Sequence, residues 1–250
     1  MTLTRLADVF ADSTPLLRMI RVIQASDRGH THEPHGAMTD IYRVRRAVPA
    51  DKAAVIGLID SAAAWLGRHK NTNQWARPWP DEPTRNGRII RGIEHGDTWM
   101  VERAGILAAT ITYRDQANPD LWTDEELNRQ RAVYVSRLIV DRAHAGQGLG
   151  AGLIDWAAVR GREQWDADWI RVDVWTTNTG LHNYYKGQDF EYLRTVDVEQ
   201  EWDYPSAVLF QKPTASVRKA SALRFEVAAE EAGLAAIADH PANGALLPVP

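Results

Sequence analysis

The chain has 250 residues, of which 44% are hydrophobic and 25% charged, as in globular proteins and unlike disordered or fibrous chains. Its net charge of −4 shows no excess of positive charge of the kind that binds nucleic acid. No run approaches the roughly 18 apolar residues of a membrane span. The absence of cysteine excludes disulfides, thiolate metal ligands and a cysteine nucleophile. No apolar leader is visible near the first residue, and we therefore expect a cytoplasmic protein.

Both ends of the chain have the composition of extensions. Residues 1–37 show weak periodicity, and we interpret them as a flexible N-terminal extension. Their histidines fit no helix face, so we expect solvated surface rather than a metal site. These histidines are His30, His32 and His35. Residues 213–250 form an Ala-rich tail, and the apolar pattern of residues 223–238 predicts one amphipathic helix in it. Residues 38–212 are left as the folded domain.

Between these ends, strand-like and helix-like segments follow one another. Strands are expected over residues 41–45, 97–103, 105–114, 132–140, 169–175, 190–196 and 205–211. Helices are expected over residues 53–66, 84–94, 149–162 and 179–187, and a polar loop over 115–130. This order predicts a single α/β domain with a mixed sheet.

The most informative motif is VDRAHAGQGLGAGLI, residues 140–154. Its glycines allow backbone N–H groups to converge, and the helix that follows adds its positive end, as in phosphate sites. A nucleotide P-loop is excluded, because Ala151 and Gly152 stand where Lys and Ser/Thr are required. Gly146, Gly148 and Ala151 formally match a dinucleotide fingerprint, but DRAHA separates the strand from its first glycine. A plain turning loop is the third interpretation.

Leu138-Ile139-Val140 followed by AGQGLG resembles the acetyl-CoA loop of the GNAT family of N-acetyltransferases. Asn178, with Tyr185 seven positions later and Phe190 five beyond that, also follows the family pattern. The resemblance covers about residues 42–212 and implies the GNAT acyl-CoA N-acyltransferase fold. Two residues depart from the pattern. Ala145 replaces an Arg or Gln, for which Arg142 or His144 are candidates to compensate, and Asp189 replaces a Gly.

The resemblance also implies a role for each matching residue. The backbone of Leu138, Ile139 and Val140 would pair with the pantetheine arm of acetyl-CoA, and an N–H near Leu138 or Val140 would stabilise the thioester oxygen. The pyrophosphate would lie on Gly146, Gln147, Gly148, Leu149, Gly150 and Ala151. Asn178 would hydrogen-bond the arm, although a helix N-cap is the simpler alternative. No metal is implied.

Tyr185 is the candidate general acid. A thiol has a pKa near 8.5 and a phenol near 10, so a hydrogen-bonded tyrosine can protonate or stabilise the leaving thiolate. Tyr184 is the neighbour with which this role can be exchanged. Because the sulfur belongs to CoA, the acceptor amine would attack directly. No base stands out: Tyr134 and Ser136 could only order water, and the carboxylates considered are Glu102 and Asp173.

The acceptor is expected to be a small-molecule or peptide amine. Candidates for an aromatic wall around it are Trp75, Trp79, Trp122 and Tyr113, although a Trp-rich loop that merely covers the sheet is an equal alternative. A non-catalytic acyl-CoA-binding or regulatory module and, less favoured, an NAD-binding oxidoreductase stay open as other functions. Exposed strand edges favour a homodimer.

Overall fold

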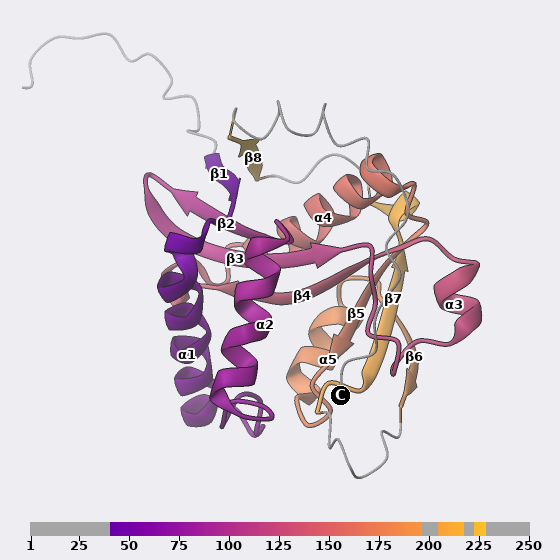
Figure 1. Ribbon diagram of the computed structural model, residues 1–250, viewed down its shortest axis with the longest axis horizontal. Coiled ribbons are helices and arrows are strands. Elements are labelled where there is room, and N and C mark those ends of the chain that lie inside the picture. Colours follow the sequence, from indigo (N-terminus) through magenta and orange to yellow (C-terminus); the bar gives the residue numbers. More distant parts are fainter. Residues whose placement is uncertain (1–40, 197–204, 218–222, 229–250) are drawn as a thin grey trace, which may run out of the picture. The chain divides into compact units, whose positions relative to one another are not determined.

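An eight-stranded mixed sheet organises the residues that the computed structural model describes, which are 41–196, 205–217 and 223–228. The strands are β1 Ile41–Arg46, β2 Thr98–Arg103, β3 Ile106–Arg114, β4 Ala132–Val140, β5 Trp169–Val174, β6 Glu191–Thr195, β7 Val208–Pro213 and β8 Arg224–Val227. Their order across the sheet is β6-β7-β5-β4-β3-β2-β1-β8 (Figure 1). The predicted α/β class with a mixed sheet is confirmed, because β4 and β5 are parallel while β1 to β4 are antiparallel neighbours.

The helices are α1 Lys52–His69, α2 Glu82–Glu94, α3 Asp124–Asn128, α4 Leu149–Trp165 and α5 Thr179–Lys186. Short 3₁₀ turns cover Pro49–Asp51, Arg142–His144 and Thr214–Ser216. Helices α1 and α2 stand side by side in front of the sheet in Figure 1, whereas α4 lies behind it. Within the described ranges, no helix is both long and apolar enough to cross a membrane.

The strand periodicity divides the core between the two faces of the sheet. In β2, Trp99 and Val101 belong to the core cluster under α4, whereas Met100 between them belongs to the cluster under α1 and α2. Successive side chains of a strand point to opposite faces, so an apolar run such as TWMV is expected where helices cover both faces. The sheet therefore has a helical layer on each side, and a site can form where two strands separate between these layers.

Strand β8 corrects the interpretation of the tail. The helix predicted over 223–238 is wrong for Arg224–Val227, which pair in parallel with β1 from Ile41↔Arg224 to Val44↔Val227. Phe225 and Val227 pack against the core, so the apolar period here is two. The open edge of β1 offered backbone partners that a helix would not use. The sheet thus extends past residue 212, while 1–37, with its three histidines, and 229–250 lie outside the described residues.

Helix α3 lies in the segment predicted to be a polar loop. It begins with a capping box in which Glu126 N–H donates to Thr123 Oγ1 and the Thr123 N–H donates to Glu126 Oε2 at 2.8 Å. Arg194 of β6 then donates twice to the Glu126 carboxylate, at 2.8 and 2.7 Å. Five residues are too few for helical periodicity to be visible, and the ion pair to a distant strand completes the helix.

We expect Glu126→Gln to lower the free energy of unfolding at pH 7 by about 1–2 kcal/mol. The Arg194 guanidinium holds the pKa of Glu126 at about 2, below the ordinary 4.5. The stabilisation is therefore complete above pH 4.5 and is lost as the pH falls from 4.5 toward 2. Urea unfolding of both proteins at pH 7 and pH 3 measures this, and the difference between them should shrink at pH 3.

The control is Asp166→Asn, because the Arg131–Asp166 pair has side chains that are 63% and 78% exposed. Such a pair contributes about 0–1 kcal/mol, and asparagine tolerates the positive φ of residue 166. An equal loss in both variants, or a pH-independent loss at Glu126, would contradict the prediction.

Candidate active site

Strands β4 and β5 separate in the middle of the sheet. Their parallel ladder ends at the pair Val135↔Val172, although β4 continues to Val140. Figure 1 shows β4 running across the view while β5 turns downward. Beyond Val135, the β5 side of β4 has no strand partner among the described residues, so its backbone groups can bind an extended ligand. Leu138, Ile139 and Val140, which the sequence analysis assigned to a ligand arm, lie in this part of β4.

A bulge at Arg137 makes the second half of β4 different from the first. The register with β3 shifts between Thr110↔Ile139 and Thr112↔Ser136, and Arg137 has a φ of 46°. Val133 and Val135 lie in the core cluster under α4, but Ile139 lies in the cluster under α1 and α2. The extra residue therefore reverses which side chains face which layer, and it brings the consecutive residues 136–138 to one cavity.

The glycine loop leads from β4 into α4. Gly146 and Gly148 have φ values of 77° and 78°, and a Cβ at either position would meet no protein atom within 4 Å. The first helical bond of α4 runs from Gly152 N–H to Gly148 O, so the N–H groups of Leu149, Gly150 and Ala151 precede it. The first turn has no acidic side chain. Open space, free N–H groups and a positive helix end fit a pyrophosphate.

Neighbouring elements hold this loop in place. Gln147 donates to the carbonyl oxygen of Ala143 at 3.1 Å and accepts a long 3.5 Å bond from the Tyr42 hydroxyl. The Arg142 guanidinium lies 3.9 Å from the centroid of the Trp65 ring of α1. Arg142, a candidate to compensate for Ala145, thus ties the loop to α1 through a cation–π contact.

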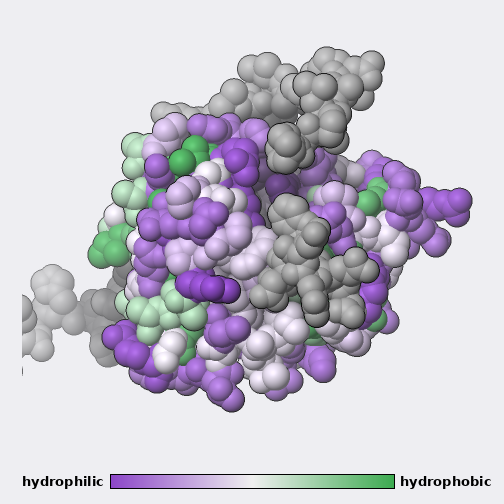
Figure 2. Space-filling view, turned by 60° about the horizontal axis from the view of Figure 1, so that its bottom comes forward, coloured by the Kyte–Doolittle hydropathy of each residue, from purple (hydrophilic) through white to green (hydrophobic). Residues whose placement is uncertain are grey.

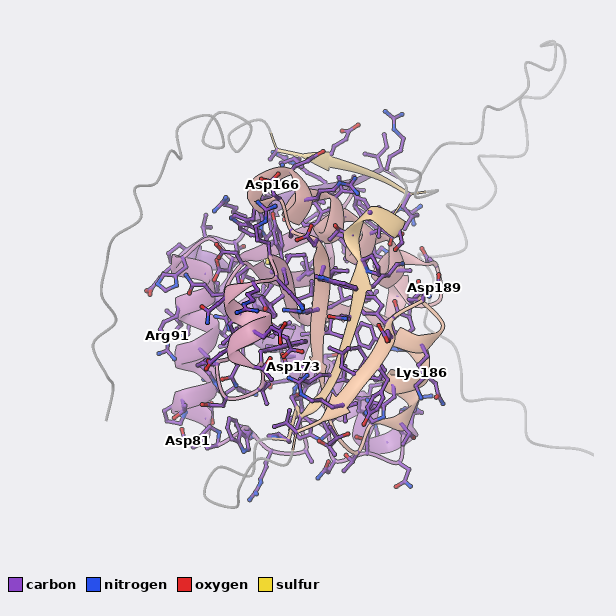
Figure 3. The ribbon with its side chains drawn as sticks, turned by 90° about the vertical axis from the view of Figure 1, so that its right-hand side faces the viewer. Asp81, Arg91, Asp166, Asp173, Lys186 and Asp189 are labelled. Atoms are coloured by element: carbon purple, nitrogen blue, oxygen red, sulfur yellow. The ribbon has the colours of Figure 1, made fainter. Side chains whose placement is uncertain are left out.

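A cavity of about 180 Å³ lies beside the separated strands. Its lining residues come from the α1–α2 loop, α2, the bulge of β4, the end of β5, α5 and Pro205-Ser206. Asp173 lines this cavity. In the view of Figure 3 it lies between the labelled residues at α2, Asp81 and Arg91, and those at the end of α5, Lys186 and Asp189. Seen from the bottom of Figure 1, the surface is mostly hydrophilic to neutral, with hydrophobic atoms in small groups (Figure 2).

Tyr185 and Tyr184 point to different places. Tyr185 lines the cavity, is 7% exposed and packs on Phe190 and Phe210 with ring centroids 5.2 and 6.2 Å away. Burial raises the pKa of the Tyr185 hydroxyl, and the nearby Tyr184 and Asp173 raise it further. Tyr184 instead packs against α4, where a Cβ on Gly150 would lie 2.9 Å from its hydroxyl. Tyr185 is therefore the tyrosine that reaches the cavity.

Asn178 joins two loops at the cavity. Its Oδ1 accepts from Leu181 N–H at 3.0 Å, so the predicted alternative of an N-cap on α5 is confirmed. Its Nδ2 donates to Gln74 Oε1 at 2.5 Å. The adjacent Asn73 Oδ1 accepts from Trp175 Nε1 at 2.7 Å. The α1–α2 loop is thus fastened to the segment that follows β5, and the contact of Asn178 with a ligand stays a prediction.

Two of the four residues predicted to form an aromatic wall lie at the cavity, and their contact with an acceptor stays a prediction. Trp75 and Trp79 line the cavity. Trp122 is wrong: it is 4% exposed in a separate cluster, with the Arg171 guanidinium 4.7 Å from its ring centroid. Tyr113 is also wrong, because it lies in the core against Trp99 at 5.9 Å. Both positions depend on tertiary packing that local sequence does not specify.

Of the proposed acid–base groups, Ser136 and Asp173 reach the cavity and two others do not. Glu102 pairs with Arg45 at 2.8 Å, and the Tyr134 hydroxyl accepts from Arg171 at 3.0 Å. Five further charged or aromatic lining residues were not predicted from the sequence, namely Arg77, Arg85, Arg88, Arg137 and Trp175. The local signal for Arg77, Arg85 and Arg88 was the excess of Arg and Trp in residues 75–88, whereas Arg137 and Trp175 lie elsewhere in the chain and had no such signal.

Comparisons with known proteins agree with this geometry. Residues 65–190 match the family described as "Acetyltransferase (GNAT) family". A Bacillus subtilis (strain 168) relative, named an uncharacterized N-acetyltransferase YesJ, is 29% identical over 150 residues, or 59% of this chain and 80% of the relative. A crystal structure of a GNAT acetyltransferase from Listeria monocytogenes 4b F2365 is 28% identical with a TM-score of 0.55, covering 69% of this chain and 94% of that one.

A GNAT acetyltransferase structure from Streptococcus agalactiae 2603 is 20% identical and shares the fold, with a TM-score of 0.53 and coverage of 69% and 95%. The family match spans half of the chain and contains the bulged strand, the glycine loop, Asn178 and Tyr185. The resemblance seen in the sequence is thereby confirmed. This chain belongs to the GNAT family of acetyltransferases.

Proposed function

We propose that the chain moves an acetyl group from acetyl-CoA to an amine of a small molecule or peptide. The observation that carries the proposal is the separation of β4 from β5. It leaves a strand edge, unpaired among the described residues, that runs from the cavity with Tyr185 and Asp173 to the phosphate-fitting start of α4. A cytoplasmic location and a homodimer belong to the same proposal and are not needed for the chemistry.

In this proposal, the backbone of Leu138, Ile139 and Val140 pairs with the pantetheine arm as a strand would. The N–H groups of residues 146–151 bind the pyrophosphate. Asn178 already uses one lone pair and one N–H, so its second N–H and second lone pair are available to the arm. Acetyl-CoA bound in this way supplies a thioester whose acetyl end faces the cavity.

The acceptor amine attacks the thioester carbon in its neutral form, and a backbone N–H at the bulge near Leu138 stabilises the oxyanion. The nitrogen, positively charged after the attack, loses a proton to water, and collapse then forms the amide and expels the CoA thiolate. Tyr185 is a phenol and is protonated at neutral pH, so it can donate its hydroxyl proton to the departing sulfur. Desolvation in the same cavity also raises the pKa of the thiol, so the proton affinities of donor and acceptor move in the same direction.

Asp173 is the proposed partner of the acceptor amine. It lines the cavity, and its charge contributes to the raised pKa of Tyr185, which places the two groups in the same electrostatic environment. A carboxylate there binds the incoming ammonium and takes its proton directly or through water.

The test compares melting temperatures with acetyl-CoA, CoA and NAD. A ligand at about 100 times its dissociation constant stabilises the fold by about 2.7 kcal/mol, which is a shift of several degrees. We expect shifts with acetyl-CoA and CoA, followed by release of CoA in the presence of an amine. A shift with NAD alone would overturn the proposal. Binding of acetyl-CoA without turnover of any amine would favour the non-catalytic module.

A further inference from the structure

The cavity wall on the α2 side is rich in arginine. Four guanidinium side chains line the cavity, and Asp173 is the one carboxylate among the described residues that do so. The four are Arg77, Arg85, Arg88 and Arg137. Arg85 is paired with Asp60 outside the lining, so Arg77, Arg88 and Arg137 against Asp173 make the formal excess among the described lining residues positive. In a partly enclosed site charges interact more strongly than in water, and this excess favours an anionic group.

Two of these arginines are held in fixed positions. Arg85 has a side chain that is 19% exposed; its Nη1 donates to Asp60 at 2.7 Å and its Nε to Asn86 at 3.1 Å. The Arg88 guanidinium lies 4.9 Å from the Trp79 ring centroid and donates to the Trp79 carbonyl oxygen. A planar guanidinium group that is already immobilised loses little conformational entropy when it binds a carboxylate or phosphate.

Arg77 lies where a second cavity joins the first. A vestibule of about 410 Å³ shares Arg77, Trp79 and Trp175 with the inner cavity. Arg77 is the charged residue among the described residues that line this vestibule, and it forms no ion pair with a described carboxylate. A molecule that enters through the vestibule therefore meets a guanidinium before it reaches Asp173.

The same contacts weaken the case for a purely cationic acceptor. Arg88 already covers one face of Trp79, and the Trp175 indole is buried with its N–H bonded to Asn73. These rings are thus poorly placed to bind an isolated ammonium by a cation–π contact. Burying such an ammonium beside several guanidinium groups is also costly.

We infer that the acceptor is a small amine that carries its own anionic group, a carboxylate or a phosphate, held by Arg77, Arg85 and Arg88 while its amine faces Asp173 and Tyr185. The inference rests on the proposed acetyl transfer. The phosphates of CoA do not compete for this wall, because the glycine loop binds them at the far end of β4 in that proposal. An inner cavity of about 180 Å³ fits a molecule of amino-acid size.

The experiment measures kcat/KM for matched pairs of acceptors with acetyl-CoA. Each of several amino acids is compared with its own amide, and phosphoethanolamine with ethanolamine, which separates carboxylate from phosphate recognition. A diamine serves as the cationic acceptor. Because the chain holds no cysteine, a thiol reagent reports released CoA alone. We expect at least one anionic member to exceed its neutral partner by tenfold or more, about 1.4 kcal/mol in transition-state binding.

Two variants and a control assign the effect to the wall. Arg77→Gln and Arg85→Gln should each raise KM for the anionic acceptor and reduce the preference over its neutral partner by about tenfold. The control Arg91→Gln removes an exposed arginine of α2, the helix that carries Arg85, that does not line the cavity, and it should keep the wild-type ratio. Melting shifts with acetyl-CoA confirm that each variant is folded and binds its co-substrate.

The outcomes separate the inference from the function on which it rests. Turnover of neutral amines or the diamine at rates equal to or above the anionic acceptors overturns the inference and leaves acetyl transfer standing. An anionic preference that survives in both arginine variants also overturns it. Acetyl-CoA binding with no turnover of any amine overturns the proposed function, and the inference with it.

Discussion

Gly148→Val is expected to abolish the melting shift produced by acetyl-CoA. Gly148 has a φ of 78°, which a β-branched residue adopts only at a cost of about 1–3 kcal/mol. The added side chain would also fill the open space toward which the first N–H groups of α4 are directed. Thermal unfolding with and without the ligand measures the loss.

The matched control is Gly105→Val in the β2–β3 turn. Gly105 has a φ of 77°, and a Cβ added there would likewise meet no protein atom within 4 Å, so its backbone strain is equal. This variant should lose a similar amount of stability and keep the full acetyl-CoA shift. A wild-type shift in Gly148→Val, or an equal loss of the shift in both variants, would contradict a phosphate site in the glycine loop.

Tyr185→Phe is expected to lower kcat by about 10²–10³ while KM for acetyl-CoA changes little. The phenyl ring keeps its contacts with Phe190 and Phe210, so only the hydroxyl that faces the cavity is lost. Steady-state release of CoA with a saturating amine measures the change.

Tyr184→Phe is the comparison, because that hydroxyl lies toward Gly150 rather than in the cavity. Its kcat should stay within about threefold of wild type, a change of less than about 0.7 kcal/mol. A large loss in Tyr184→Phe with none in Tyr185→Phe would exchange the two roles. No loss in either would leave Tyr185 as a packing residue.

Local patterns were sufficient to predict most of the sheet and the glycine-loop half of the candidate site. The glycine loop and the start of α4 follow from the order of residues, since a positive φ and a helix start depend on neighbours in sequence. The apolar runs of β4 and β5 likewise identify strands that are covered on both faces.

The parts that the sequence could not predict depend on distant partners. Strand β8 exists because β1 has an open edge, and α3 is completed by Arg194 from β6. The arginine side chains gather only because α2 and the loop before it line the same cavity as β4 and β5, which no short-range pattern encodes. Trp122 and Tyr113 were misassigned for the same reason: an aromatic residue lines a cavity or fills a core according to which layer covers it.

The single extra residue at Arg137 has a consequence for related chains of different length. Removing one residue from 136–138 would leave Ile139 and Val140 opposite the same partners in β3, and therefore on the same faces, but would take one side chain away from the cavity. An alignment with such a shorter chain that places no gap there would therefore mismatch every later position of the strand. One insertion or deletion at this bulge can thus change the lining of the cavity without altering the rest of the sheet.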